Sequence, residues 1–202
     1  MFVLGLTGSI GMGKSTTAAI FREAGVLVHD SDAAVHALYR GTAAPLVEAA
    51  FPGTLRDGAI DRGVLAQRVI HDQAALARLE AIVHPLVRAE RAQFVAAARA
   101  DGADLIVLDI PLLFETGCDN EVDAVLLVTA PEAVQKARIA ARPGMTDDKL
   151  AAIIAKQMPD AEKRRRADLI LDTSHGHDAA AQQVRDLIGA IRAGRVKARH
   201  HA

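Results

Sequence analysis

The segment that decides the fold is Gly8-Ser-Ile-Gly-Met-Gly-Lys-Ser15, which has the pattern G-x-x-x-x-G-K-S. An apolar run, residues 2–6, precedes it, and a helix-compatible stretch, residues 16–24, follows it. A strand that delivers such a loop and a helix that leaves it bring backbone N–H groups together around an anion. The sequence therefore predicts a phosphate-binding loop. The alternative, a glycine-rich turn that carries Lys-Ser by chance, is disfavoured by this strand–loop–helix frame.

Each residue type in this loop has a chemical role. Gly8, Gly11 and Gly13 are expected to permit backbone conformations that a side chain would oppose. Lys14 would place a positive charge near the β- and γ-phosphates, and the Ser15 hydroxyl could bind Mg²⁺. The chain is therefore expected to bind a nucleoside triphosphate.

Composition and charge narrow the class of protein. Half of the 202 residues are hydrophobic and 24% are charged, which is typical of a globular chain with one domain, or one core with an inserted subdomain. The formal net charge is −1, so no global field attracts nucleic acid or an anionic membrane. There is no Trp, one Tyr and five Phe, too few for an aromatic platform that binds single strands. We expect small-molecule ligands and no nucleic-acid partner.

The cellular location is expected to be the cytoplasm. The one cysteine, Cys118, cannot form an intrachain disulfide, which fits a reducing compartment. The first apolar run breaks at Thr7-Gly8 and has no charged leader, so it is interpreted as a strand rather than a signal peptide. No apolar run approaches the roughly twenty residues of a membrane span, and no membrane contact is expected.

Five short runs rich in Val, Ile and Leu are expected to be strands: residues 2–6, 26–29, 105–110, 124–129 and 169–172. Continuous rather than alternating runs indicate strands that are covered on both faces, as in a parallel sheet between helices. The predicted fold class is α/β, a three-layer sandwich around a five-stranded parallel sheet. Ligands should bind at the carboxyl ends of the strands.

Two long interruptions of this pattern are informative. The first lies between Asp32 and Leu105 and is too long for one crossover helix. Apolar residues recur there at helical intervals, and Pro85 is expected to open a new helix just after His84. We interpret this region as a helical insertion that binds an acceptor substrate. The second interruption holds expected helices at residues 132–141 and 146–156, and a closing helix is expected at 178–192.

Two carboxylates follow the second expected strand, in His29-Asp30-Ser31-Asp32. At a strand end they could bind a metal or accept a proton from a hydroxyl, and Asp32 is the candidate base. The alternative is that Ser31 or Asp32 caps a helix that begins near Ala33. The two roles do not exclude one another, and the residues alone leave the choice open.

Asp109 ends the third expected strand. An acid there is the usual Mg²⁺-side partner of a phosphate loop, and a loop-capping role is the alternative. Arg138 and Arg142 are four residues apart and would share one helix face, from which they could close over the phosphates. The run Lys163–Arg166 is expected mainly to be a solvated basic face. His36 and His84 could contact a substrate phosphate, although a lone His is more often structural.

Taken together, these segments closely resemble the dephospho-coenzyme A kinase family over nearly the whole chain. The strings that carry the resemblance are Leu6–Thr16, Asp30-Ser-Asp32 with His36, Ile60-Asp-Arg62 with Leu65, Ile82-Val-His-Pro-Leu-Val-Arg88, Asp109-Ile-Pro-Leu-Leu-Phe-Glu115, Gln135 with Arg138, Arg142 and Gln157, and Ala167-Asp168. The phosphate loop is shared by many NTPases, whereas the strings that contain Pro85 and Pro111 are far more specific. The chain departs from the family pattern at two places. Pro143 follows Arg142, where the family usually has an acidic residue, and Asp172-Thr-Ser174 replaces an Asn-Gly-like turn after the last strand.

The resemblance implies transfer of the ATP γ-phosphoryl group to the ribose 3′-hydroxyl of dephospho-CoA, with Mg²⁺. It implies Asp32 as the base, together with Lys14, Arg142 and Thr7 as catalytic residues. The expected ATP contacts are Gly8, Gly11, Met12, Gly13, Lys14, Ser15, Thr16 and Arg138. The expected acceptor contacts are Asp30, His36, His84, Arg88 and Leu113, and the expected Mg²⁺ ligands are Ser15 and Asp109.

The resemblance also implies three parts. They are a nucleotide-binding core (residues 1–33, 101–137 and 166–202), a helical acceptor-binding insertion (34–100) and a lid (138–165). We expect a monomer or a weak homo-oligomer.

The alternatives are another small-molecule kinase with a phosphate loop, of the nucleoside monophosphate or shikimate type, and a regulatory or non-catalytic NTP-binding protein. The length of the insertion and its His84-Pro85 string disfavour the other kinases. A guanine-reading Asn-Lys-x-Asp string is absent, which disfavours a GTPase switch.

Overall fold

A computed structural model describes residues 1–70 and 72–199, and these form two compact units. One unit, which we call the sheet unit, comprises Met1–His29 and the described residues from Ala98 onward. The other, the helical unit, comprises Asp30–Ala97. The segment expected to be a lid falls within the sheet unit, and its role as a lid stays a prediction.

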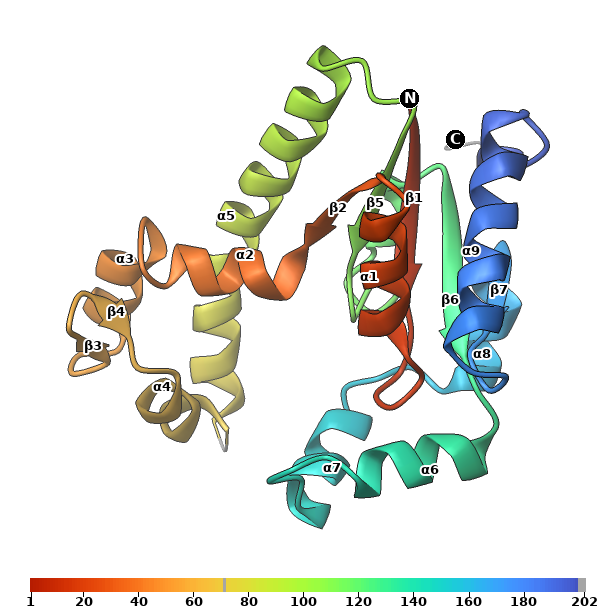
Figure 1. Cartoon of the computed structure of the whole chain (residues 1–202). Helices are drawn as coiled ribbons and strands as arrows, with labels where there is room; N and C mark the ends of the chain where they lie inside the picture. The colour runs from red at the N-terminus through yellow and green to blue at the C-terminus, as the bar shows by residue number, and fades with distance from the viewer. Residues whose placement is uncertain (71, 200–202) are drawn as a thin grey trace. The chain divides into compact units, whose positions relative to one another are not determined.

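The sheet unit is built on five strands in the order β2-β5-β1-β6-β7, with parallel pairing of β1 with β5 and β6, and of β6 with β7 (Figure 1). The strands are β1 (Phe2–Thr7), β2 (Leu27–Asp30), β5 (Leu105–Asp109), β6 (Ala124–Thr129) and β7 (Leu169–Asp172). The predicted α/β class and all five predicted strands are confirmed. Every residue of β5 and β6 is buried, as expected of apolar runs with both faces covered.

One face of the sheet is covered by two helices that lie side by side, α1 (Lys14–Glu23) and α9 (His177–Arg192) (Figure 1). Phe21 of α1 and Val184 of α9 are fully buried against Leu4 and Leu6 of β1. Because successive strand residues face opposite sides, Gly5 points to the other face. A Cβ at Gly5 would lie 2.7 Å from a methyl carbon of Leu113, so the segment after β5 covers that face closely.

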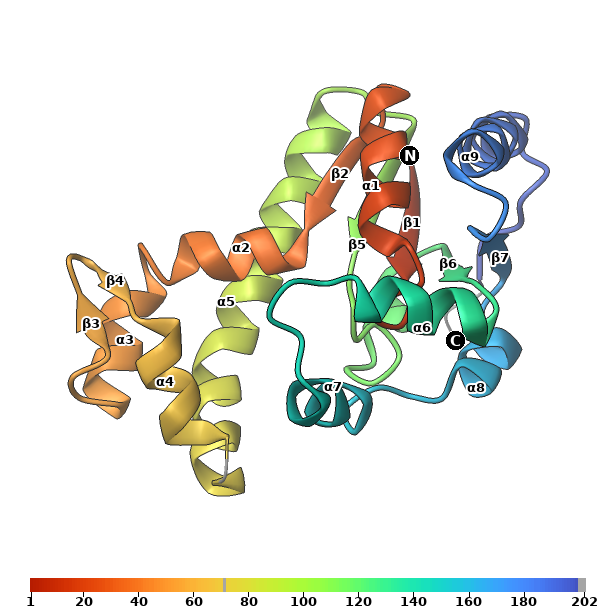
Figure 2. The ribbon, with the colours of Figure 1, turned by 60° about the horizontal axis from the view of Figure 1, so that its bottom comes forward.

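After β6 the chain forms three short helices, α6 (Glu132–Ala140), α7 (Asp147–Ile154) and α8 (Asp160–Arg166), before it enters β7 (Figure 2). The first two confirm the sequence expectation, and the Thr146 hydroxyl caps α7 by accepting from the Lys149 N–H. The third was not foreseen. A short 3-10 helix, η1 (Cys118–Glu121), lies between β5 and β6.

The helical unit contains α2 (Ser31–Leu38), α3 (Ala43–Ala50), α4 (Arg62–Val69), most of α5 (Gln73–Ala100), and the hairpin strands β3 (Leu55–Arg56) and β4 (Ala59–Ile60). It has its own core, in which Val47, Phe51, Leu65 and Leu79 are buried together. A separate core is what allows a segment of this length to be compact by itself.

The expectation that Pro85 opens a new helix was wrong, because α5 runs through it. Proline removes one helical hydrogen bond and its ring opposes the carbonyl four residues earlier, so proline alone would favour a break. Val83 is buried in the core of the helical unit, and Leu86 packs against the same cluster. The packing of residues on both sides of Pro85 against this core stabilises a helix that continues through the proline.

No helix in the described part of the chain is long and apolar enough to span a membrane.

Candidate active site

The phosphate loop turns into α1 at Gly13, which has a φ of 93° and serves as the N-cap residue without a side-chain cap. This left-handed conformation is open to glycine and opposed by a Cβ. The first N–H groups of α1 therefore have no side-chain cap and face the loop, where the helix dipole favours an anion. The predicted cradle is formed by this geometry.

Gly8 is needed for a different reason from the one expected. Gly11 and Gly13 have positive φ angles, but Gly8 does not. A Cβ at Gly8 would lie 2.7 Å from the carbonyl oxygen of Val128 in the neighbouring strand β6. Gly8 thus permits close approach of two backbones rather than an unusual dihedral angle.

We predict that Gly8→Ala lowers the melting temperature and weakens ATP binding, because the backbone of β6 or of the loop must move. Overpacking of this kind destabilises a protein by about 1–3 kcal/mol. Gly189→Ala in α9 is the matched control, since nothing lies within 4 Å of its Cβ and alanine favours a helix. Thermal unfolding with and without ATP measures both. Equal melting temperatures for the two variants would contradict the close-approach argument.

Lys14 and Asp109, predicted separately, are brought together. Lys14 Nζ lies 2.5 Å from Asp109 Oδ1, and the Asp109 side chain is only 4% exposed. Strand β5 places the carboxylate beside the loop because β1 and β5 pair in parallel, with Leu6 opposite Asp109. A hard oxygen donor is thus held next to the phosphate cradle, and Ser15, in the first turn of α1, is exposed.

Thr7, expected to be catalytic, is fully buried, and its hydroxyl donates to the carbonyl of Pro111 at 3.1 Å. This bond ties the end of β1 to the segment that follows β5. Leu113, expected to contact the acceptor, is also fully buried and packs at Gly5. Leu113 therefore belongs to the core and supports the segment that follows Asp109, and its contact with the acceptor stays a prediction.

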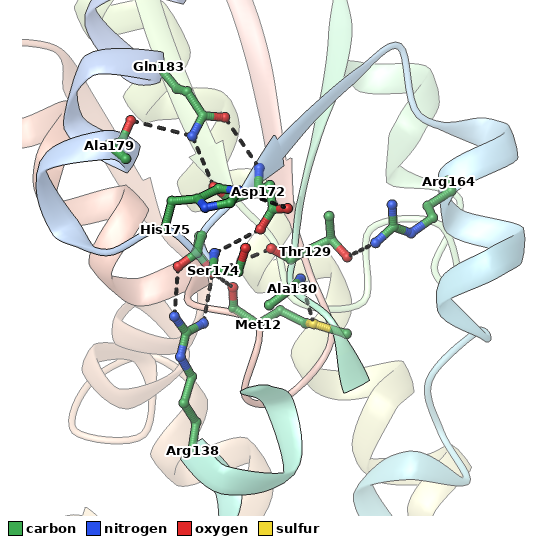
Figure 3. Close-up of polar contacts among 11 residues, drawn as sticks. Met12, Thr129, Ala130, Arg138, Arg164, Asp172, Ser174, His175, Ala179 and Gln183 are labelled. Carbon is green, nitrogen blue, oxygen red and sulfur yellow. Dashed lines mark hydrogen bonds and ion pairs between the residues drawn. The ribbon is translucent and has the colours of Figure 1, made fainter. Parts of the chain in front are cut away.

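Arg138 of α6 reaches from α6 to the segment after β7 (Figure 3). Its guanidinium donates to Thr173 Oγ1 at 2.7 Å and to the Thr173 carbonyl at 2.8 Å, and it lies 3.5 Å from the Gly11 carbonyl. The Thr173 hydroxyl in turn donates to the Met12 carbonyl at 2.8 Å. These hydrogen bonds hold Arg138, a predicted ATP contact, beside the phosphate loop.

Thr173 was not among the predicted site residues, although it lies in the Asp172-Thr-Ser174 departure that the sequence shows. It directly follows the last strand, at the sheet edge where ligands of such folds bind, and a polar residue there is a usable signal. Its side chain would lie 3.0 Å from a Cβ at Gly13, so it also packs against the loop. Met12 is buried, and its sulfur accepts from the Ala130 N–H at 3.2 Å, so Met12 supports the loop from within.

A pocket of about 240 Å³ adjoins the loop in the sheet unit. Its lining includes Gly13, Thr16, Arg138, Arg142 and His177. Both predicted arginines therefore face the same space as the start of α1.

The basic run on α8 is for the most part the exposed face that we expected, because Arg164, Arg165 and Arg166 are exposed, but its first residue is an exception. Lys163 is fully buried and its Nζ lies 2.9 Å from Glu115 Oε1. Arg164 donates to Asp160 at 2.6 Å and to the Thr129 hydroxyl, and Arg166 donates to Asp119 at 3.0 Å. The contacts with Glu115, Thr129 and Asp119 join α8 to other segments of the sheet unit, whereas the Arg164–Asp160 pair lies within the helix.

The helical unit carries the predicted general base and all of the residues predicted to bind the acceptor substrate except Leu113. Asp30 is the N-cap of α2: its Oδ1 accepts from the N–H groups of Asp32 and Ala33, both at 3.0 Å. The alternative that Ser31 or Asp32 caps this helix was wrong. Asp32 is exposed in the first turn of α2, so its carboxylate is not used as the cap.

The same unit exposes three more residues that were predicted to bind the acceptor substrate: His36, His84 and Arg88. The Arg62 guanidinium donates to His36 Nε2. His84 and Arg88 are four residues apart on α5, so they share a helix face. Each residue could present a cation or a hydrogen-bond donor to a phosphate.

The parallel sheet, the glycine loop capping α1 and the Lys14–Asp109 pair define the class of P-loop nucleotide-binding proteins. The family model described as "CoaE: Dephospho-CoA kinase" matches residues 2–178. A dephospho-CoA kinase from Mesorhizobium japonicum is 63% identical over 96% of this chain and 99% of its own length. The chain belongs to the dephospho-CoA kinase family, and the family function is the ATP-dependent phosphorylation of dephospho-CoA.

Solved structures agree with this fold. A crystal structure of TT1252 from Thermus thermophilus is 36% identical, with a TM-score of 0.82, over 94% of this chain and 96% of that one. Dephospho-CoA kinase from Campylobacter jejuni is 23% identical and has the same fold, with a TM-score of 0.66 over 94% and 96% of the two chains. The expected enzyme class, a kinase that uses ATP, is confirmed by the family.

Proposed function

We propose that this chain transfers the γ-phosphoryl group of Mg²⁺-ATP to the ribose 3′-hydroxyl of dephospho-CoA, with Lys14, Asp109, Arg142 and Asp32 as the residues that carry the reaction. The observation that supports this best is the Lys14–Asp109 pair beside the uncapped start of α1, in a chain of this family. We propose that the enzyme acts in the cytoplasm, as a monomer or a weak homo-oligomer, on small molecules alone.

The donors near the loop fit a magnesium ion. Mg²⁺ prefers oxygen ligands, often one or two from the protein, with the rest from water and phosphate. The Asp109 carboxylate and the exposed Ser15 hydroxyl are such donors. When bound, the ion would neutralise charge on the β- and γ-phosphates.

In the proposed reaction, the ribose oxygen forms a bond to the γ-phosphorus while the bond from that phosphorus to the β–γ bridging oxygen breaks. Asp32 orients the hydroxyl and takes its proton late, because a loose transition state needs little activation of the nucleophile. Lys14 and Arg142 stabilise the charge on the transferring group. Residues 138–165 act as a lid that excludes water, so ATP is not hydrolysed.

We propose that the helical unit binds the acceptor. Asp30, together with the exposed residues His36, His84 and Arg88, would hold dephospho-CoA, with the cationic groups on its phosphates. The Arg62 contact would keep the His36 ring oriented for that purpose. ATP would remain on the sheet unit, through Gly8 to Thr16 and the Arg138 side chain.

The test is ADP release from Mg²⁺-ATP in a coupled assay, with and without dephospho-CoA, with the product checked by mass. Acceptor-dependent release and a product that is heavier by one phosphoryl group are expected. Hydrolysis of ATP that ignores the acceptor would overturn the proposal.

We also predict that removal of Mg²⁺ with a chelator abolishes turnover, and that Asp109→Asn raises the Mg²⁺ concentration needed for half-maximal rate. Loss of the carboxylate removes both a metal donor and the partner of Lys14. A titration of Mg²⁺ at fixed ATP measures the shift. Asp104→Asn, at the opposite end of β5, is the matched control and should leave the titration unchanged.

A further inference from the structure

Two glutamines outside the phosphate loop bind the backbone of one of its residues, Ile10. The Gln135 side-chain N–H, from α6, donates to the Ile10 carbonyl at 2.7 Å. The Gln157 side-chain oxygen, from the segment after α7, accepts from the Ile10 N–H at 3.2 Å. Both backbone polar groups of Ile10 are thus bound by side chains that follow the loop by more than a hundred residues.

The first glutamine is itself held in place. Gln135 packs against the loop, because a Cβ at Gly11 would lie 3.1 Å from Gln135 Cγ and 2.8 Å from Ile139 Cγ1. Its backbone N–H donates to the Pro131 carbonyl within the first turn of α6. The amide is therefore presented from the first turn of a helix that packs against the loop.

The second glutamine is anchored through its neighbour. The Met158 N–H donates to Glu115 Oε1 at 2.7 Å, and the same oxygen is paired with the buried Lys163. Glu115 lies six residues after Asp109, on the segment that Thr7 and Leu113 support. A continuous set of contacts therefore runs from α8 through Gln157 to the tip of the phosphate loop.

A loop with three glycines in eight residues has many alternative conformations, and ordering it opposes ligand binding. Side chains that fix the Ile10 backbone in advance reduce that opposition, which is preorganisation. We propose that Gln135 and Gln157 are positioning residues that hold the phosphate loop in its ATP-binding conformation. This inference rests on the proposed use of the loop for ATP, and it is tested by binding alone, without the acceptor.

The opposite polarity of the two contacts allows a sharp test. Gln135 donates a hydrogen bond and Gln157 accepts one, so glutamate, which only accepts, preserves the second contact and not the first. Methionine has a similar length and removes either one. The variants are Gln135→Met, Gln157→Met, Gln135→Glu and Gln157→Glu, with Gln182→Met on the exposed face of α9 as control.

The ATP dissociation constant is measured by calorimetry, together with KM for ATP, kcat and the melting temperature. Each loop-contacting methionine variant is expected to weaken ATP binding about tenfold, the value of one hydrogen bond, with kcat and melting temperature little changed. Gln157→Glu is expected to bind ATP about tenfold more tightly than Gln135→Glu, by the same hydrogen-bond value, although both add the same charge. The Gln182→Met variant should match the wild type.

The outcomes separate the two proposals. If the wild type binds ATP and the four variants bind equally well, the positioning role is overturned and the proposed function stands. If Gln135→Glu and Gln157→Glu weaken binding equally, the contacts do not act through hydrogen-bond polarity and the inference is also overturned. A wild-type chain that binds no ATP overturns the proposed function and this inference together.

Discussion

Asp32→Asn is expected to lower turnover on the order of 10²-fold, the lower end of the contribution of a general base, because a loose transition state needs little activation of the nucleophile, while the ATP dissociation constant changes little. The amide keeps the size of the side chain but cannot take the proton of the ribose hydroxyl. Because Asp30 caps α2, the substitution leaves the helix start intact. Single-turnover assays together with ATP calorimetry measure the two effects.

Asp178→Asn is the matched control for Asp32→Asn, since Asp178 is also an exposed aspartate in the first turn of a helix. It should leave turnover unchanged. Near-normal turnover in Asp32→Asn would refute its role as the base. Loss of ATP affinity along with turnover would instead place Asp32 at the nucleotide.

Lys163→Met is expected to destabilise the protein by about 3–5 kcal/mol, because removal of one partner leaves the Glu115 charge buried without its counterion. Lys163 is fully buried and its Nζ lies 2.9 Å from Glu115 Oε1, so two opposite charges are in direct contact. For a chain of this length the melting temperature should fall on the order of 10 °C. Differential scanning calorimetry gives the value.

A double variant identifies the cause. Lys163→Met combined with Glu115→Gln removes both charges, while the carbonyl oxygen of the new side-chain amide can still accept from the Met158 N–H. It should be more stable than Lys163→Met alone, since two buried charges replaced together leave none uncompensated. Arg192→Ala, which breaks a largely exposed pair with Asp104, should change the melting temperature little. A double variant as unstable as the sum of the single ones would refute a charge effect.

Local patterns predicted the sheet and the loop because these depend on short, strongly apolar runs and on fixed spacing. The apolar runs predicted the five strands. Because these strands pair in parallel, their carboxyl ends lie at one edge of the sheet, and this places Asp109 beside Lys14. The course of α5 through Pro85 did not follow, since the core of the helical unit overrides the local preference of proline. The buried position of Lys163 depends on Glu115, which the sequence places 48 residues away.

One missed element had a local signal. Strands β3 and β4 are joined by Asp57-Gly58, both with positive φ, which is the strongest short sequence sign of a hairpin. Each strand has only two residues, too few for an alternating pattern. Glu48 secures the hairpin by accepting from the N–H groups of Gly53, Thr54 and Leu55. These hydrogen bonds hold the pKa of the Glu48 carboxyl below its ordinary value, and the bond from the Gly53 N–H has the largest effect.

The interruption of the sheet unit by the helical unit sets an order of events during synthesis on the ribosome. Strand β1 is made first, but its partners β5 and β6 begin only at Leu105 and Ala124. The helical unit, Asp30–Ala97, is one continuous segment and is complete before either partner has been translated. Domains fold as units while the chain grows, so the second unit in the sequence would fold before the first. The phosphate loop is thus among the earliest segments translated, but its contacts with Gln157 and Thr173 can form only after those residues have been translated.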